Sequence, residues 1–390
     1  AELEPIYKDL IGTKISVATL NKVADDITSY YRNKGFILTR AVVPPQAIDK
    51  GEVKIRIVEG FIDSVTIQGD DAANDSLIKA YGDRIRASKP LDVATLERYL
   101  LLMEDLPGVE ARAVLQASPT TPGASDIVVN ITRKAVDFSA TVDNRGSRFL
   151  GPVQLSSTAA YNNLFGLNDQ TQIRLLSTPL TFDELFFGEL RHEQQWGSDG
   201  TKAVISGSYI ETRPEFNLTP FDIVGRSTAV SVGLTHPVVR SRRENLFING
   251  DFTLRNSDLN SLDANLSYDK TRVFGLSTSY DFVDSTSAIN RAELRYARGV
   301  DFGTKVRNQV RSRANGEPVF DKFTSRLSRI QPIDGPWSIF AAASGQYSPD
   351  PLVASEEFAL GGSEFGSAYD AAELTGASGA AGRLAIQYQG

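Results

Sequence analysis

Residues Val136–Asp143 read VDFSATVD, a run in which apolar and polar side chains alternate without a break. Successive side chains of a strand point to opposite sides, so this period of two predicts a β-strand with one apolar and one polar face. Asn144-Arg-Gly146 follows and predicts a turn. The chain before this run mixes helical and strand periodicity, whereas the chain after it contains strand periodicity only.

From Ala135 onward, runs of about ten residues with period two are separated by clusters of Gly, Asn, Asp, Ser and Pro. In several runs one parity is apolar and the other polar; Leu384, Ile386 and Tyr388, for example, oppose Arg383 and Gln387. We count twelve such runs, near residues 136–143, 153–163, 169–178, 185–195, 202–213, 225–239, 244–256, 270–283, 287–299, 320–333, 337–348 and 382–389.

The length of these runs favours a transmembrane barrel, because a tilted strand needs about 9 to 11 residues to cross a bilayer. Strands of a soluble β-sandwich, the alternative, usually have about five or six residues. A barrel would turn its apolar parity to lipid and its polar parity to a wet lumen, and its backbone groups would pair in a closed ring. The predicted lumen residues are Glu189, Arg191, Arg291, Glu293 and Arg295.

The N-terminal third contains two copies of one unit. Ser16 predicts the cap of a helix with apolar residues at spacings of three and four, and Gly35 predicts its end. Strands are then predicted at Phe36–Val43 and Lys54–Glu59, separated by Pro44-Pro45.

The second copy repeats Val17-Ala-Thr-Leu20 as Val93-Ala-Thr-Leu96. It predicts a strand at Ile62–Gln68, helices at Asp75–Tyr81 and from Val93, and strands at Val109–Leu115 and Asp126–Arg133. The first copy starts short of the corresponding leading strand. We therefore expect domains at residues 1–60, 61–134 and 135–390.

Composition argues against catalysis. The 390 residues include no cysteine and two histidines, and the formal net charge is −7. His192 and His236 fall in predicted strands without metal-ligand spacing, and no basic block suits a phosphate backbone. No apolar run is long enough for a helical membrane span. We expect no enzyme activity, cofactor, metal site or nucleic-acid partner.

Several motifs in order resemble one family. Tyr31-Arg-Asn-Lys-Gly35-Phe36, Val43-Pro-Pro-Gln46 and Ile57-Val-Glu-Gly60 resemble the POTRA signature of two-partner secretion transporters. Val142-Asp-Asn-Arg-Gly146 and Asn163-Leu-Phe-Gly-Leu-Asn-Asp-Gln170 resemble the first barrel hairpin and turn of the same family. The resemblance implies POTRA repeats followed by an antiparallel transmembrane β-barrel of sixteen strands. Twelve countable strands imply that about four are missing here.

The resemblance also implies a long loop that enters the lumen and gates it, starting at Leu360-Gly-Gly362. The expected gating residues are Gly361, Gly362, Ser367 and Tyr369. Ser367 stands where the family pattern has an arginine, and Ala377 stands where it has an acidic residue. Both departures are compatible with loss of an ion pair.

The function that follows is an outer-membrane translocator. POTRA domains in the periplasm would capture an unfolded exoprotein of adhesin or haemolysin type, and a monomeric barrel in outer-membrane lipid would export it without nucleotide hydrolysis. A POTRA edge strand with Phe36, Leu38, Arg40 and Val42 is the expected client site, by strand addition. A barrel-assembly and insertion factor and a β-rich surface adhesion domain remain alternatives.

Overall fold

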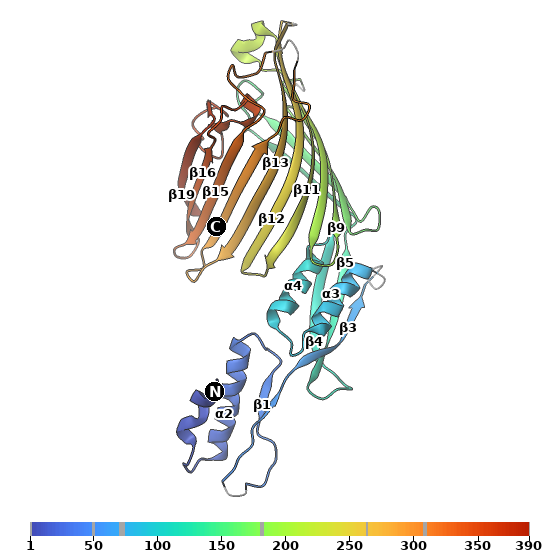
Figure 1. The fold of residues 1–390 in the computed structure, drawn as a ribbon, viewed down its shortest axis with the longest axis vertical. Coiled ribbons are helices and arrows are strands. Elements are labelled where there is room, and N and C mark those ends of the chain that lie inside the picture. Colours follow the sequence, from blue (N-terminus) through green and yellow to red (C-terminus); the bar gives the residue numbers. More distant parts are fainter. Residues whose placement is uncertain are drawn as a thin grey trace. The chain divides into compact units, whose positions relative to one another are not determined.

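The computed structural model describes residues 2–48, 51–69, 75–179, 183–262, 264–306 and 310–389. It contains two compact units, Ala1–Arg133 and Lys134–Gly390, which are treated separately below (Figure 1). In the described residues, no helix combines the length and apolar character needed to cross a membrane.

The first repeat packs one long helix on a short two-stranded sheet. Its elements are α1 (Glu4–Tyr7), η1 (Lys8–Leu10), α2 (Val17–Asn33), β1 (Arg40–Val42) and β2 (Arg56–Val58). Ser16 caps α2 as predicted, since its side chain accepts a hydrogen bond from the Thr19 N–H at 3.1 Å. The apolar stripe of α2 (Val23, Ala24 and Ile27) packs against Ala41 of β1.

The predicted strand Phe36–Val43 is wrong in its first half. Only Arg40–Val42 are in a strand, while the Ile37 N–H bonds to the Gly35 carbonyl and the Thr39 N–H to the Phe36 carbonyl, each at 3.1 Å. These are turns. Leu38 packs against the core of the second repeat instead of standing on a strand face, so a tertiary contact overrides the local pattern.

The second repeat has the predicted order of strand, helix, helix, strand, strand: β3 (Phe61–Gln68), α3 (Ser76–Ala87), α4 (Val93–Glu104), β4 (Val109–Ala117) and β5 (Ala124–Arg133). The sheet order is β3-β5-β4, with β3 parallel to β5. Asp75 is the cap of α3, which extends beyond the predicted Tyr81 to Ala87. Both helices cover the sheet and bury Ile78, Tyr81, Ile85, Leu102 and Met103.

The two repeats join through backbone contacts. The Leu91 N–H bonds to the Gly60 carbonyl and the Val93 N–H to the Gly35 carbonyl, both at 2.9 Å. A Cβ at Gly60 would lie 2.4 Å from the Cβ of Leu38, so only glycine permits this approach. The repeats therefore form one unit.

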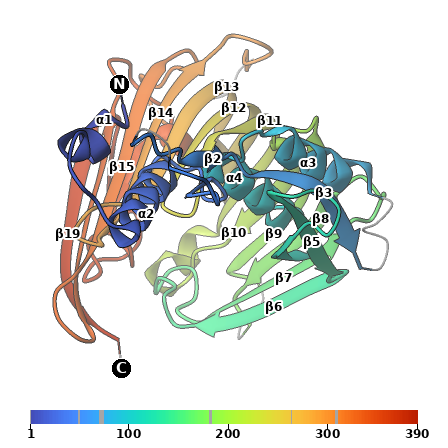
Figure 2. The same cartoon turned by 90° about the horizontal axis from the view of Figure 1, so that it is seen from below.

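The second unit is built on one antiparallel sheet of twelve strands, which curves strongly (Figure 2). Each strand pairs with its neighbours in the chain, in the order β19-β16-β15-β14-β13-β12-β11-β10-β9-β8-β7-β6. The strands are β6 (Val136–Asp143), β7 (Gln154–Asn162), β8 (Asp169–Ser177), β9 (Leu185–Trp196), β10 (Thr201–Thr212), β11 (Ile223–Arg240), β12 (Glu244–Ser261), β13 (Ala264–Val283), β14 (Ile289–Gly299), β15 (Asp321–Pro332), β16 (Trp337–Tyr347) and β19 (Gly379–Tyr388). All twelve predicted strands are confirmed.

One face of this sheet is apolar and exposed. Phe138 of β6 is 71% exposed and Leu384 of β19 is 77% exposed, although a soluble sandwich would bury such side chains. Paired rings continue this face across strands, for example Phe252 and Phe274, whose centroids lie 4.4 Å apart. The sandwich alternative is therefore wrong, because the strands form one sheet with its apolar face outward, the arrangement of membrane barrels.

Candidate functional site: the polar face and its loop

All five predicted lumen residues lie on the polar face of the twelve-stranded sheet. On β9, Glu189 is opposite Arg174 of β8 and Ser208 of β10, whereas the intervening Leu190 points to the apolar side and is 55% exposed. Arg191 pairs with Glu193 at 3.0 Å. The polar face here carries charges of both signs.

On β14, Arg291 pairs with Asp281 of β13 at 2.7 Å, and Glu293 is opposite Arg326 of β15. Arg295 reaches across β13 to Asp251 of β12, with an Nη2–Oδ2 distance of 2.9 Å.

Arg295 can reach Asp251 because Gly275 lies between them. A Cβ at Gly275 would stand 2.0 Å from the guanidinium. Sequence reasoning missed both Gly275 and Asp251, because the contact skips one strand. A glycine inside a long strand was the available signal.

The loop between β16 and β19 contains η4 (Ala354–Glu356), β17 (Phe358–Leu360) and β18 (Leu374–Gly376), and β17 pairs with β18. Gly361 and Gly362, two of the predicted gating residues, have φ of 117° and 92°. The Gly362 N–H bonds to the Tyr369 carbonyl at 3.1 Å, and a Cβ at Gly361 would lie 2.1 Å from the Asp370 carbonyl oxygen. These glycines shape the tip, on which Ser367 and Tyr369 are exposed.

We call residues 348–378 the acidic loop. Four of its carboxylates form ion pairs with basic side chains from other parts of the same unit. The sequence analysis did not single out these carboxylates, although all four lie within fifteen residues. The ion pairs are Lys322–Glu356 at 2.6 Å, Arg313–Glu357 at 2.6 Å, Arg326–Glu364 at 3.3 Å and Arg148–Asp370 at 3.0 Å.

These pairs come from separate places in the sheet unit. Lys322 and Arg326 lie on β15, Arg313 lies in the β14–β15 connection, and Arg148 lies between β6 and β7. The loop is thus held at several points, on the polar face and at the β6–β7 hairpin.

The Arg313–Glu357 contact is bidentate. Arg313 Nε lies 3.0 Å from Oε1 and Nη2 lies 2.6 Å from Oε2 of Glu357. These hydrogen bonds hold the pKa of the Glu357 carboxyl below its ordinary value of 4.5. Glu357 is 11% exposed, so the pair is shielded from water on the carboxylate side.

Ala377 occupies a partly apolar place, whereas Ser367 is exposed. Ala377 packs against an apolar cluster that includes Phe320 and Leu352, and its carbonyl accepts a hydrogen bond from Gln346 Nε2 at 3.0 Å. A carboxylate at position 377 would have to be desolvated there. The four paired acidic residues are on the loop, and their basic partners lie on β15 and in the β6–β7 and β14–β15 connections.

The predicted client edge of the first repeat is partly closed. The Ala41 N–H of β1 donates to Thr28 Oγ1 of α2 at 2.9 Å, so α2 covers this edge. Leu38 is half-buried, and Phe36 packs its ring on Tyr31 with centroids 6.4 Å apart. Only Arg40 and Val42 of the predicted set are exposed on β1.

The outer edge of β2 is open among the described residues, where its one strand partner is β1. The Gln46 side chain bonds to both backbone groups of Lys54 at 2.8 Å, because Pro44-Pro45 cannot donate to the ladder. Lys54 therefore faces β1. Strand groups alternate in direction, so the backbone groups of Ile57 face the outer edge of β2.

Comparison with known proteins settles the family. Residues 123–389 match the family described as haemolysin secretion/activation protein ShlB/FhaC/HecB, and residues 1–60 match the POTRA domain, ShlB-type. The chain belongs to the ShlB/FhaC/HecB family. As a member of this family it is an outer-membrane protein, and its POTRA domain lies in the periplasm.

Curated relatives of this ShlB/FhaC/HecB member include the heme/hemopexin transporter protein HuxB of Haemophilus influenzae (strain 86-028NP), 24% identical over 371 residues, with 93% of this chain and 64% of the relative covered. The outer membrane transporter CdiB of Dickeya dadantii (strain 3937) is 25% identical over 361 residues, with 88% and 61% covered. The chain thus spans less than two thirds of the length of these relatives.

Solved structures agree on the fold. The structure of CdiB from Escherichia coli aligns with a TM-score of 0.78 at 20% identity, and the alignment covers 99% of this chain and 72% of the CdiB chain. BamA from Haemophilus ducreyi has a TM-score of 0.55 at 12% identity, with 96% and 74% covered.

Proposed function

We propose that this chain is the translocator of a two-partner secretion system, which captures an unfolded exoprotein in the periplasm and exports it along the polar face of its sheet. The observation that carries the proposal is the charged polar face with an acidic loop held against it by ion pairs. A membrane pore for an extended chain needs a wet wall and a removable obstruction, and this arrangement supplies both. Family membership supports the same activity.

Client capture is proposed at the small sheet of the first repeat. The exposed Arg40 and Val42 belong to this sheet, and the open β2 edge with Ile57 offers backbone groups for strand addition. Phe36 and Leu38 act as supports of the junction between repeats rather than as client contacts. Residues 61–134 serve as a second POTRA domain that keeps the first in a fixed place.

The acidic loop is the proposed gate. Gly361 and Gly362 shape its tip, and Ser367 and Tyr369 are exposed there and can contact a passing chain. The paired carboxylates hold the loop in place. Opening needs the ion pairs to exchange for water or for client side chains, which requires no catalysis, nucleotide or cofactor. Folding of the client outside the cell would make the export irreversible. The chain acts as a monomer in outer-membrane lipid.

The experiment is secretion from a host that expresses the complete transporter with a candidate exoprotein of adhesin or haemolysin type. Expected is exoprotein in the medium, reduced at least tenfold by Ile57→Pro, which breaks the open edge of β2. Lys54→Ala is the matched control, since its backbone groups face inward. Export that is indifferent to Ile57→Pro would refute the capture site, and absence of export with every candidate would refute the translocator.

A barrel-assembly factor is the second candidate, favoured by the likeness to BamA. It predicts that depletion of this protein lowers the amounts of unrelated folded outer-membrane barrels. The translocator predicts that only the exoprotein is affected. Quantitative analysis of outer-membrane proteins after depletion separates the two.

A further inference from the structure

The outward face of β13 changes character along its length. Lys270 and Arg272 share this face with the exposed Phe274 and Leu276, because side chains of one parity point the same way. Farther along, Tyr280 and Phe282 stack with centroids 4.8 Å apart. The apolar stretch thus ends in aromatic rings at one end of the strand and in two cations at the other.

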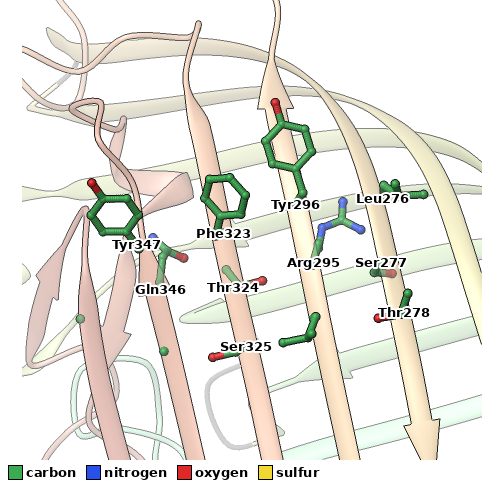
Figure 3. A pocket seen from close by; sticks show the side chains of 13 residues that line it. Leu276, Ser277, Thr278, Arg295, Tyr296, Phe323, Thr324, Ser325, Gln346 and Tyr347 are labelled. Atoms are coloured by element: carbon green, nitrogen blue, oxygen red, sulfur yellow. The ribbon is translucent and has the colours of Figure 1, made fainter.

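Beside Leu276, the apolar face is hollowed into a groove of about 540 Å³. Tyr296, Phe323 and Tyr347 form a row along it on three neighbouring strands (Figure 3). Ser325 and Gly345 are opposite each other in register, and the hollow forms because both residues are small. The aromatic rings and small residues that line this groove suit a hydrocarbon chain and provide few hydrogen bonds for a polar ligand.

The cations lie just beyond the groove. Arg298 of β14 is opposite Phe274 and stands one same-face position past Tyr296, roughly 7 Å farther along the strand. It pairs with Asp321. In the described part of the chain, no carboxylate lies within ion-pair distance of Lys270 or Arg272.

Arg272 is nevertheless held in place. Its guanidinium donates to the Arg255 carbonyl at 2.9 Å and to Asn256 Oδ1 at 3.1 Å. An ordered guanidinium without a counter-charge is arranged to accept an anion.

Chain direction places this cluster at the cell surface. β6 begins at Val136, directly after the periplasmic repeats end at Arg133. Neighbouring strands are antiparallel, so β14 runs in the same direction as β6. The end of β14 with Arg298, and the beginning of β13 with Lys270, therefore lie at the outer leaflet.

We propose that this surface binds a phosphorylated, multiply acylated glycolipid of the outer leaflet, with a phosphate on Lys270 and Arg272 beside Arg298 and an acyl chain in the groove. Charge and apolar lining meet at the level where headgroup and hydrocarbon meet in a bilayer. The proposal rests on the outer-membrane location and not on export, so either can fail without the other.

The test titrates the full chain, in neutral detergent, with lipid A carrying its phosphates and with chemically dephosphorylated lipid A, and reads bound lipid by native mass spectrometry. Expected is preferential binding of the phosphorylated form. The double variant Lys270→Gln, Arg272→Gln should lose about thirty-fold in affinity. The charge-matched control Lys14→Gln, Lys22→Gln changes two exposed lysines of the first unit and should bind as the parent does.

A second variant tests the groove independently. Ser325→Phe fills the hollow and should weaken lipid A binding while the protein stays folded, as judged by heat-modifiable migration in gels. Equal binding of both lipid forms, or unchanged affinity of the double variant, would overturn the phosphate site. Full competition by millimolar inorganic phosphate would show a plain anion site and would equally overturn the lipid assignment.

Discussion

The two faces of the twelve-stranded sheet share one backbone and one set of hydrogen bonds, but their side chains make different contacts. The apolar face carries Ile173, Leu190 and Leu384, and nothing in the chain has to cover it in lipid. The polar face carries charges, and the acidic loop is bound there by ion pairs. One strand can therefore face lipid with one parity of its side chains and bind a loop of the same chain with the other.

The largest effect is expected where a charged side chain is introduced on the apolar face of the sheet. Ile173→Arg, at the middle of β8 and 51% exposed on the apolar side, should destabilise the folded barrel by about 2–4 kcal/mol. Gln172→Arg is the matched control, because the neighbouring position faces the wet side and should cost little. Urea unfolding in lipid vesicles measures both, and similar losses for the two variants would contradict the assignment of faces.

Gly361→Val tests the tip of the acidic loop. Its φ of 117° suits glycine alone, and a Cβ would meet the Asp370 carbonyl oxygen at 2.1 Å. We expect the closed loop to lose about 1–3 kcal/mol and the open-channel current in planar bilayers to rise. Gly335→Val is the control, because it also places a valine at positive φ (53°) but lies in the turn between β15 and β16, where a Cβ meets no atom within 4 Å. Unchanged current with Gly361→Val would remove the loop from the gate.

Glu357→Gln weakens the bidentate pair on the closed loop. We expect a loss of about 1 kcal/mol, below the value for a fully buried pair because Arg313 is 45% exposed. Combining Glu357→Gln with Arg313→Gln should cost less than the sum of the two. Additive effects on channel current would mean that the two side chains do not act together.

The same pair predicts a dependence on pH. The pKa of Glu357 is lowered in the folded loop, so the pair stabilises the closed loop above its ordinary value of 4.5, and this contribution is lost as pH falls through the lowered value. Channel current should therefore rise as the pH falls from 4.5 through the lowered pKa of Glu357. In Glu357→Gln this acid-dependent rise should shrink.

Arg148→Gln should have the smallest effect. Arg148 pairs with Asp370 but is 60% exposed, so water screens the contact and the loss should be a few tenths of a kcal/mol. Single-channel recording can detect such a change as a modestly higher opening frequency. A loss as large as that of Glu357→Gln would show that the tip contact, not the pair with Arg313, controls the loop.

How far the sequence could be read varies along the chain. Residues 270–283 were predicted as a strand with the correct faces, because a long run with period two has one reading. Phe36–Thr39 were misread, because four residues can follow a turn as well as a strand and the contact of Leu38 with the second repeat decided between them.

The candidate site was predicted unevenly for the same reason. Glu189, Arg191 and Arg295 were placed on the polar face by parity alone. The partners of the loop carboxylates were not, because Lys322, Arg313 and Arg148 are between 34 and 222 residues away in the chain from the carboxylates they bind.

The sequence by itself determined the number and faces of the twelve strands and the order of the repeats, because side-chain alternation and helix caps act between near neighbours. Only the tertiary structure decided that α2 closes one edge of the small sheet and that Gly275 lets Arg295 reach Asp251. It also decided which basic residues, on β15 and in two connections, pair with the carboxylates of the acidic loop. Those contacts join residues far apart in the chain, and their geometry exists only once the sheet has curved.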